Sequence, residues 1–257
     1  MSEEGDAVAR ALILDHELVV GGRALRVEEA EAYLWSATHR DPFAHRDPRQ
    51  AAASRWYFHR VGGSYRGGSF KGLDLTFGPP DTFGGVLIRS LRDGAELVCG
   101  PSRCVDHLLA LAGARSVAEL DDGRDAFDPA GRLQLRPAPR ERALLRTARV
   151  GLTLKRHVEG DGRPRWLLVP DRFLTDPRAV SKGRVHAVIA LHQAGLDPRA
   201  IRERTGSQAV DRYLARYAEG WRDPSFDRFV GRALADADYA ELHGIWTRTY
   251  GSDTIAS

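Results

Sequence analysis

The sequence predicts an α+β protein with a mixed, curved β-sheet, surrounding helices, a protruding β-hairpin and an all-helical C-terminal extension. Three observations lead to this expectation. Residues 23–34 alternate in polarity as a strand does, residues 56–77 combine aromatic side chains with glycines as a hairpin does, and apolar residues beyond 176 recur at helical spacing. A chain of 257 residues is long enough for one domain with a sizeable extension, which we place at 1–175 and 176–257.

The first elements are a short helix and a long strand. The pattern after Asp6 predicts a helix through Leu14, with Asp6 as its cap. The alternation that follows predicts a strand with carboxylates on its inward face. The residues expected on this face are Leu25, Val27, Glu29, Glu31 and Tyr33. A carboxylate on an inward face must be paired, solvated in a pocket or functional, so this strand is the first place to look for chemistry.

The central part of the chain predicts further strands around one helix. The stretch 56–77 predicts a hairpin, 84–91 predicts a buried strand, and 97–99 is expected to pair with that strand. Ser102 is expected to cap a helix that runs to about 112. A charged loop is expected as far as Pro139, followed by a helix over 140–146 and strands over 149–154 and 165–170.

Beyond Pro177 the pattern predicts helices only. Gly195 is expected to end one helix, and Asp197 to open the next. The segment 189–217 resembles a helix-turn-helix, but Gly206 stands about two residues too close to Leu214 for that motif. We therefore prefer a helical extension that packs against the rest of the chain, with the helix-turn-helix as the alternative.

Composition and charge exclude several classes of protein. Hydrophobic residues make up 42% and charged residues 28%, which argues against a disordered, collagenous or coiled-coil chain. The longest apolar runs, at 11–14 and 188–191, are far shorter than a bilayer span, and the acidic start lacks the basic region of a signal peptide. We therefore expect a cytoplasmic protein. The formal net charge of +3 is by itself weak evidence for a polyanionic partner.

The two cysteines give little support for a metal centre. Cys99, Cys104 and His107 form a C-x4-C-x2-H string, but a structural zinc site needs four ligands and no further cysteine completes it. Free cysteines usually behave as small buried apolar groups. We expect no bound metal and no cofactor. The sequence also contains no P-loop, no G-x-G-x-x-G motif after a strand and no H-E-x-x-H motif.

Glu31 is the first candidate for catalysis. Hydrolysis of a glycosidic bond needs a carboxylate that activates water or stabilises a cationic sugar, and such a group works best in a partly desolvated pocket. Tyr33 lies on the same expected face, and His45 follows it in the chain. The alternative is that Glu28, Glu29 and Glu31 form a solvated strand face.

The hairpin is the second candidate, because residues 43–72 carry five arginines and one lysine against a single acid. A protein that extracts a base from a duplex needs cations for the phosphates and an apolar wedge that fills the gap in the stack. Arg60, Arg66 and Lys71 are the candidates for the phosphate contacts, and a lyase role for Lys71 is disfavoured. Tyr65 and Phe70 are the candidate aromatics. The alternative is that the aromatic residues only pack in the sheet.

Six segments, in the same order, resemble the alkyladenine (3-methyladenine) DNA glycosylase family. The first, EAEAYL at 29–34, is similar to the E-x-E-A-Y-L segment of that family. The others are DPFAH at 41–45, the aromatic hairpin from Phe58, GVLIRSL at 85–91, GPSR at 100–103, and RVGL at 149–152 followed by Trp166. The likeness spans roughly 18–170, and six pieces in the family's order are hard to obtain by chance.

The resemblance implies an enzyme that flips an alkylated purine out of the duplex and hydrolyses its N-glycosidic bond with water, without a metal or a Schiff base. It implies that Glu31 is the general base and that Tyr33 and His45 are pocket walls that stack on and hydrogen-bond the base. Phe70 matches the intercalating wedge, and Arg89 matches a residue that contacts DNA or supports the pocket. An alkylated purine is cationic or nearly so, which suits aromatic walls.

Departures from the family pattern bear on the substrate range. The second aromatic wall of the family's pocket falls on Gly67, and Tyr65 is the expected substitute. The asparagine that rejects guanine falls near Thr76 or Asp74, and three extra residues precede His45. We therefore expect a wider pocket, with a bulkier lesion or weaker discrimination.

The expected partner is double-stranded DNA that carries damaged purines, bound by a monomer associated with the nucleoid. The 176–257 extension lies outside the resemblance, and it either extends the DNA footprint or covers the sheet. Two other functions stay open. One is a nucleic-acid-binding protein that has kept the scaffold without the chemistry, and the other is a hydrolase of another N-glycoside, such as a free nucleoside.

Overall fold

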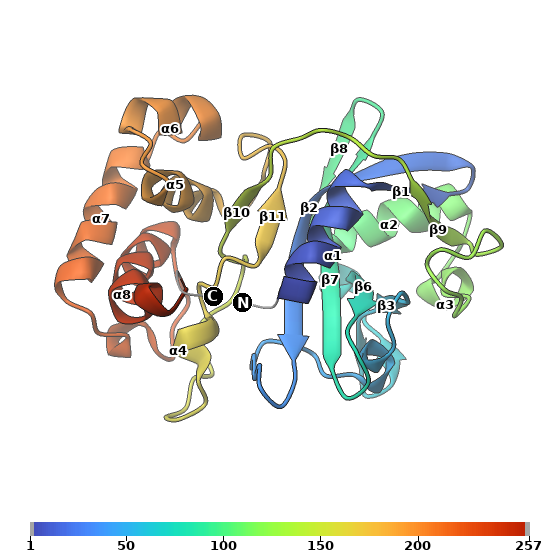
Figure 1. Cartoon of the computed structure of the whole chain (residues 1–257), viewed down its shortest axis with the longest axis horizontal. Coiled ribbons are helices and arrows are strands. Elements are labelled where there is room, and N and C mark those ends of the chain that lie inside the picture. The colour runs from blue at the N-terminus through green and yellow to red at the C-terminus, as the bar shows by residue number, and fades with distance from the viewer. Residues whose placement is uncertain (1–2, 255–257) are drawn as a thin grey trace.

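The structure is a computed structural model, and it describes residues 3–254. It has the expected α+β fold. Figure 1 shows α5, α6, α7 and α8 gathered at one side of the molecule, with β10 and β11 between them and the rest of the sheet.

The strands are β1 His16–Val20, β2 Arg23–Trp35, β3 Trp56–Phe58, β4 Arg60–Val61, β5 Ser64–Tyr65, β6 Leu73–Phe77, β7 Phe83–Asp93, β8 Glu96–Cys99, β9 Leu133–Pro137, β10 Leu145–Thr147 and β11 Arg172–Leu174. The helices are α1 Glu3–Leu14, α2 Pro101–Ala112, α3 Val117–Leu120, α4 Arg163–Trp166, α5 Arg184–Gln193, α6 Pro198–Thr205, α7 Val210–Arg222 and α8 Asp236–Thr254, with short 3-10 turns at Pro48–Ala51, Gly68–Phe70 and Asp227–Phe229.

One large sheet organises the first part of the chain. Its strands follow the order β10-β11-β2-β7-β6-β3, while β1 pairs with β2 and β9, and β8 pairs with β7. Every strand pairing within residues 3–254 is antiparallel, so the sheet is antiparallel rather than mixed. The long strand predicted at 23–34, the strand at 84–91 and its pairing with 97–99 are confirmed as β2, β7 and β8.

A bulge in β2 corrects the predicted face of the carboxylates. The register against β7 slips at Glu28, and a second irregularity at Arg89 compensates for it on the partner strand. The alternation therefore reverses, because one extra residue turns every later side chain to the other face. Apolar residues on both sides of the bulge face the same core, namely Leu25, Val27, Ala30 and Ala32. Glu29, Glu31 and Tyr33 consequently lie on the opposite face from Leu25 and Val27.

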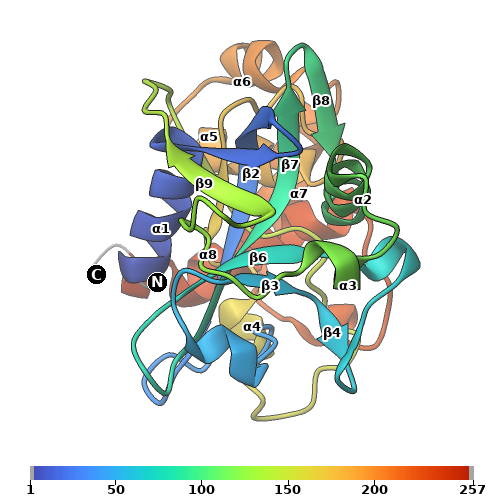
Figure 2. The same cartoon turned by 90° about the vertical axis from the view of Figure 1, so that its right-hand side faces the viewer.

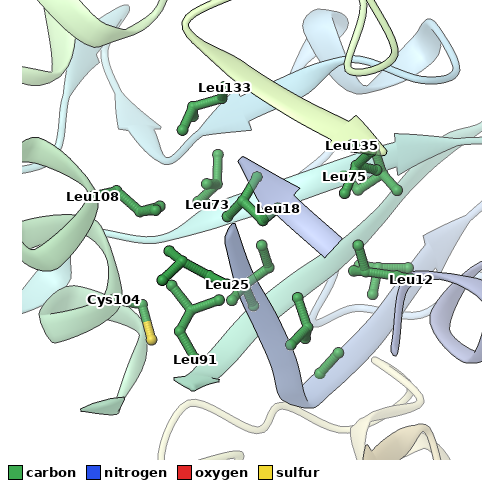
Figure 3. Packing of buried hydrophobic residues seen from close by; sticks show 14 of the residues in the cluster. Leu12, Leu18, Leu25, Leu73, Leu75, Leu91, Cys104, Leu108, Leu133 and Leu135 are labelled. Carbon is green, nitrogen blue, oxygen red and sulfur yellow. The ribbon is translucent and has the colours of Figure 1, made fainter. Parts of the chain in front are cut away.

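The first hydrophobic core lies between the sheet, α1 and α2. Figure 3 shows Leu12 from α1, Leu18 and Leu25 from β1 and β2, and Leu108 from α2 converging on it. Asp6 does not begin α1, which starts at Glu3. Ser102 does not cap α2 either: Gly100 holds the N-cap position, and the Ser102 hydroxyl donates instead to the Gly68 carbonyl, at 2.8 Å.

The hairpin predicted between 56 and 77 is present and has a small second hairpin at its tip. Strand β3 pairs with β6, and the two-residue strands β4 and β5 form a separate ladder beyond them. Gly62 and Gly63 make the turn with positive φ values of 55° and 81°, which glycine adopts without strain. Figure 2 shows β4 at the edge of the molecule, on the same side as α3.

The predictions between 133 and 170 are wrong in their details. The helix expected over 140–146 is absent, and the segment instead leads into β10. The strands expected over 149–154 and 165–170 are loop and a short helix, while β9 and β11 were not predicted. Two buried arginines explain part of this difference. Arg149 leaves the sheet to bind Asp41, at 2.6 Å, and Arg172 anchors β11 on Glu29, at 2.6 Å.

A second hydrophobic core holds the C-terminal helices together. The predicted run of helices after 176 is confirmed, with Asp197 capping α6 and Gly206 ending it in the left-handed conformation. Helices α7 and α8 approach so closely at Gly220 and Gly244 that a Cβ atom at either position would lie 2.0 Å from a backbone oxygen of the other helix. Residues before 176 also enter this core, from Ala148 to Val169, so it begins earlier in the chain than the expected extension. No helix within residues 3–254 is both long and apolar enough to cross a bilayer.

Candidate active site

Glu31 is a fully buried carboxylate held by three donors. Its side chain is 0% exposed, and β2 places it between β7 and β11. Oε1 accepts a hydrogen bond from the Val150 backbone N–H at 2.6 Å, and Oε2 accepts from the Tyr33 hydroxyl at 2.9 Å and from Arg89 at 3.2 Å. A carboxylate offers about four lone-pair positions, so one position on Oε1 is left for a further donor such as water.

A buried ion-pair network of Glu29, Arg89 and Arg172 holds this carboxylate in position. Arg89 binds Glu29 at 3.0 Å as well as Glu31, and Arg172 binds Glu29 from β11. Ser90 also donates to Glu29, at 2.7 Å. Burial opposes the charged form of Glu29, but Arg172 and Arg89 outweigh it and lower the pKa of Glu29 below its ordinary value. The network fixes the Arg89 guanidinium and therefore the position of Glu31.

Tyr33 links the carboxylate to a pocket. Burial and the neighbouring charge of Glu31 raise the pKa of Tyr33 well above its ordinary value, so the phenol keeps its proton and donates to Glu31. The Arg149 guanidinium lies over the Tyr33 ring, 4.4 Å from its centroid. This guanidinium is itself fixed by Asp41 and by the carbonyl oxygens of Ala32 and Trp166, at 3.2 and 3.1 Å.

The pocket beside Tyr33 has a volume of about 150 Å³. A cavity of that size accommodates an aromatic ring such as benzene. Its walls combine aromatic, aliphatic and polar side chains: Tyr33, Phe43, His45, Gln50, His59, Asp74, Leu87 and Leu152. Glu31 is not one of these lining residues, and Tyr33 connects it to the pocket.

Two histidines and an aspartate form the polar wall of this pocket. His59 Nε2 lies 2.8 Å from Asp74 Oδ1, and the His45 ring stands edge-on to the His59 ring with centroids 4.3 Å apart. Desolvation by the surrounding protein atoms and the neighbouring His59 lower the pKa of His45 to about 4, although more than a third of the His45 residue is exposed. The His45 imidazole is therefore neutral at pH 7.

The hairpin meets the pocket at His59. The His59 N–H donates to the Gly72 carbonyl at 3.0 Å, and the His59 carbonyl accepts from the Arg66 N–H at 2.9 Å. Residues 60–71 therefore extend directly from the pocket wall. Phe70, the expected wedge, is 70% exposed at the end of a 3-10 turn. With most of its surface exposed, the Phe70 ring contributes little to packing in the fold.

The expected phosphate contacts have partners within the protein. The Arg60 guanidinium lies 3.6 Å from the Tyr65 ring centroid, and both side chains bind Asp121, at 3.3 and 2.7 Å. The Lys71 ammonium forms an ion pair with Asp106 on α2. Arg66 donates to the Arg60 carbonyl, at 3.2 Å. These contacts hold the hairpin against α2 and α3.

Two residues expected at the site, Tyr65 and Thr76, lie elsewhere. Tyr65 does not line the pocket, because its hydroxyl binds Asp121. The buried Thr76 hydroxyl bonds backbone atoms of Ala52 and Arg55. Arg89, by contrast, is at the site: it is only 9% exposed and binds Glu31 at 3.2 Å, in the position of a residue that supports the pocket.

Sequence reasoning missed much of the pocket. Phe43 and Leu152 lie in segments that carry the family resemblance, but nothing in those segments marks them as walls. Gln50 stands outside any motif, and His59 lies in the aromatic hairpin without any feature that marks it as a wall. Asp74 was considered only as a possible place for an asparagine. The sequence does indicate that Asp74 and Thr76 share one face of a strand, because they are two residues apart. Only Asp74 lines the pocket.

The cysteine–histidine string is not gathered into one site. Cys104 is buried, and burial raises the pKa of its thiol to about 12. Its Sγ contacts the Val98 carbonyl, whereas Cys99 Sγ contacts the Ala179 carbonyl, at 3.8 Å. His107 binds Asp93 instead, at 3.1 Å.

The chain was compared with known proteins. No family model matches it. An uncharacterized protein of Acanthamoeba polyphaga mimivirus is 36% identical over 129 residues, which cover 43% of this chain and 60% of that protein. The match thus spans less than two thirds of the relative. Because that protein is itself uncharacterized, the similarity assigns no activity to this chain.

Proposed function

We propose that the protein is a DNA glycosylase that flips an alkylated or otherwise damaged purine out of a duplex and hydrolyses its N-glycosidic bond. The observation that carries this proposal is the placement of Glu31, a buried carboxylate bonded to the wall of a ring-sized pocket. A carboxylate in a desolvated setting is the group that such a hydrolysis needs.

The free lone-pair position of Glu31 gives the carboxylate a chemical task. A water bonded to Oε1, next to the Val150 N–H, is the nucleophile that this carboxylate would activate. Its oxygen forms a bond to the anomeric carbon while the N-glycosidic bond breaks, and the electron pair of that bond leaves with the base. The carboxylate takes the proton of the water. For a cationic purine the base leaves as a neutral molecule, so protonation of the leaving group is not required.

The pocket walls suit a flat base. Tyr33 and Phe43 offer aromatic surface, which attracts a cationic or electron-poor ring. His45 is neutral at pH 7 and therefore does not repel a cationic base. Gln50 and Asp74 offer hydrogen-bonding groups to the edge of a ring.

The hairpin supports the DNA-binding part of the proposal. Extruding a base leaves a gap in the stack, which an apolar side chain can fill. Phe70 is exposed on the hairpin that starts at the pocket wall. Arg66, Lys71 and Arg60 surround it in the sequence, and each remains at least partly accessible for a phosphate.

A lesion screen tests this proposal. Wild-type protein is incubated with duplexes that each carry one damaged purine, and free base is scored by chromatography. The proposal predicts base release from at least one alkylated duplex. Release of no base from any lesion, combined with tight and strongly salt-dependent DNA binding, would favour the non-catalytic alternative. Base release from free nucleosides with no steep salt dependence of duplex binding would favour the N-glycoside hydrolase.

A further inference from the structure

The polar wall of the pocket has the composition of a metal site. Within residues 3–254, His45, His59 and Asp74 are the one group of three histidine, cysteine or acidic side chains whose ligand atoms all lie within 4.8 Å of one another. Two imidazoles and one carboxylate form a ligand set that binds zinc and other divalent transition metals. The sequence predicts no bound metal, because its cysteine–histidine string lacks a fourth ligand and the family resemblance implies none.

The spacing of the donor atoms is close to what coordination requires. Ligand atoms around a tetrahedral zinc ion, bonded at about 2.0–2.1 Å, lie about 3.3 Å apart. His59 Nε2 and Asp74 Oδ1 are 2.8 Å apart, slightly closer than this, and all separations in the group are within 4.8 Å. An ion would replace the hydrogen bond between His59 and Asp74 by two coordination bonds, and His45 supplies the third from its exposed loop.

Gln50 orients the carboxylate for this role. Gln50 Oε1 accepts from the Asp47 N–H at 3.4 Å in a capping box, which directs its amide nitrogen the other way. That nitrogen donates to Asp74 Oδ2 at 3.1 Å. Asp74 therefore turns Oδ1 toward the imidazoles. Partners of this kind hold metal ligands in position and affect metal affinity strongly.

Two glycines leave the space that these side chains occupy. A Cβ atom at Gly72 would lie 2.4 Å from His59 Nδ1. A Cβ atom at Gly85 would lie 2.7 Å from Asp74 Oδ2 and 2.8 Å from the Gln50 amide nitrogen. Neither distance is possible for a real side chain, so the absence of a side chain at both positions is needed for the cluster to pack as it does.

From this geometry we infer that His45, His59 and Asp74 bind a zinc ion in the wall of the pocket. Three protein ligands leave one coordination position, and because all three line the pocket, that position faces it. An open position is typical of reactive zinc sites, whereas structural sites have four protein ligands. The open position takes a water or a neutral ring that offers a lone pair, so with zinc bound the pocket suits a neutral damaged purine rather than a cationic one. This inference goes beyond the proposed excision of bases and does not rest on it.

Metal binding by the full-length, tag-free protein tests the inference. The protein is treated with EDTA, freed of chelator and titrated with zinc against a chromophoric competitor. Wild type is expected to bind one equivalent. His45→Gln, His59→Gln and Asp74→Asn are each expected to weaken binding by about 100-fold or more, and Gln50→Ala by about tenfold. Cobalt(II) bound at the site should show the strong visible absorption of a tetrahedral complex.

A matched control variant and a fold control separate loss of ligand from loss of structure. His157 pairs with Asp161 at 2.6 Å, outside any three-donor group within residues 3–254. His157→Gln should therefore leave zinc binding unchanged. His45 is exposed, so His45→Gln should leave the circular dichroism spectrum unchanged as well. Failure of wild type to bind zinc, or one equivalent bound with unchanged affinity by His45→Gln or Asp74→Asn, would overturn the inference.

Discussion

Tyr33 performs two tasks with one side chain. Its ring forms a wall of the pocket, and its hydroxyl donates to Glu31. Because burial and the Glu31 charge raise its pKa well above the ordinary value, Tyr33 keeps its proton and donates this hydrogen bond at neutral pH. The Arg149 guanidinium over the ring limits how far Tyr33 can turn. The position of the carboxylate and the shape of the pocket are therefore coupled through one residue.

Tyr33→Phe should separate the two tasks. The ring stays, so affinity for damaged DNA should change little. Loss of the hydroxyl removes one donor to the carboxylate, which we expect to slow base release by about tenfold. Single-turnover assays of base release would measure this. Tyr57→Phe is the control, because it removes a hydroxyl that donates to Asp47, at 3.4 Å, from a ring outside the pocket lining. Equal rates for Tyr33→Phe and wild type would show that the bond to Glu31 has no part in the reaction.

The sequence predicts the pair of Glu31 and Tyr33 but not what surrounds it. Two residues of the same strand, two positions apart, share a face wherever the strand begins, so their proximity follows from period two alone. Their partners Arg89 and Arg149 come from distant segments, as does Arg172, which binds the neighbouring Glu29. In a chain with so many arginines, nothing local distinguishes a buried guanidinium from an exposed one, because the difference lies in tertiary ion pairs.

At the scale of elements, the bulge in β2 decides which residues reach the site. Without the extra residue at Glu28, the alternation that buries Leu25 and Val27 would also direct Glu31 into the first core. A bulge satisfies both requirements within one strand: apolar residues face α1, while carboxylates face the arginines and the pocket. Strict alternation cannot predict this, because a one-residue irregularity leaves no clear mark in the sequence.

Phe70 tests the role of the hairpin. Phe70→Ala should reduce base release from duplex DNA by about tenfold or more, since the gap left by the extruded base is no longer filled. The melting temperature should stay unchanged, because the ring is 70% exposed. Phe127→Ala removes another exposed ring, 46% exposed, from a loop near β1 and serves as the control. Equal duplex excision by wild type and Phe70→Ala would exclude a wedge role.

Element prediction was most reliable where local signals agree. The hairpin 56–77, strand β7 and helices α5 to α7 combine regular spacing with glycine or capping residues at their ends. Prediction failed between 133 and 174, where strands are three to five residues long and bind other segments through their own arginine side chains, as Arg172 of β11 binds Glu29. Such short strands form because neighbours pair with them, which a local pattern does not record.

The whole molecule is built around two cores that meet at β10 and β11. Phe173 of β11 belongs to the first core, and Ala148, which directly follows β10, belongs to the second. The paired strands β10 and β11 therefore connect the helical part to the sheet. Arg172 carries this link further, since it binds Glu29 on β2 and the carbonyl oxygen of Gly183 at the start of α5. The C-terminal helices therefore help to fix the ion-pair network around Glu31.

A buried histidine pair in the second core makes stability depend on pH. His186 Nδ1 and His243 Nε2 are 2.9 Å apart, which leaves room for one shared proton. Burial lowers the pKa of His243 to about 3, and burial together with His243 and Arg172 lowers that of His186 well below its ordinary value. Above pH 6.5 neither state of the chain protonates these rings appreciably. As the pH falls from 6.5 toward 3, only the unfolded chain takes up the protons, so stability falls.

Urea unfolding at pH 7.0 and pH 5.0 measures this effect. Each imidazole that must stay neutral costs about 1.4 kcal/mol of stability per pH unit below its unfolded pKa. Wild type should therefore lose roughly 2 kcal/mol per ring over this interval. The double variant His186→Phe/His243→Leu should lose much less between the two pH values, whereas His192→Gln, a partly exposed control, should behave as wild type. The same acid sensitivity in the double variant would contradict this assignment.

The most direct test of the account compares Glu31→Gln with wild type and with Glu28→Gln, on the best duplex from the lesion screen. Glu28 is a buried carboxylate of the same strand that binds Arg140 at 2.8 Å, outside the site. Glu31→Gln should lower single-turnover release of free base by about 10²- to 10⁴-fold, with DNA affinity within a few-fold of wild type. Glu28→Gln should keep the wild-type rate. Release of base by folded Glu31→Gln at the wild-type rate would contradict the central claim that this carboxylate carries the chemistry.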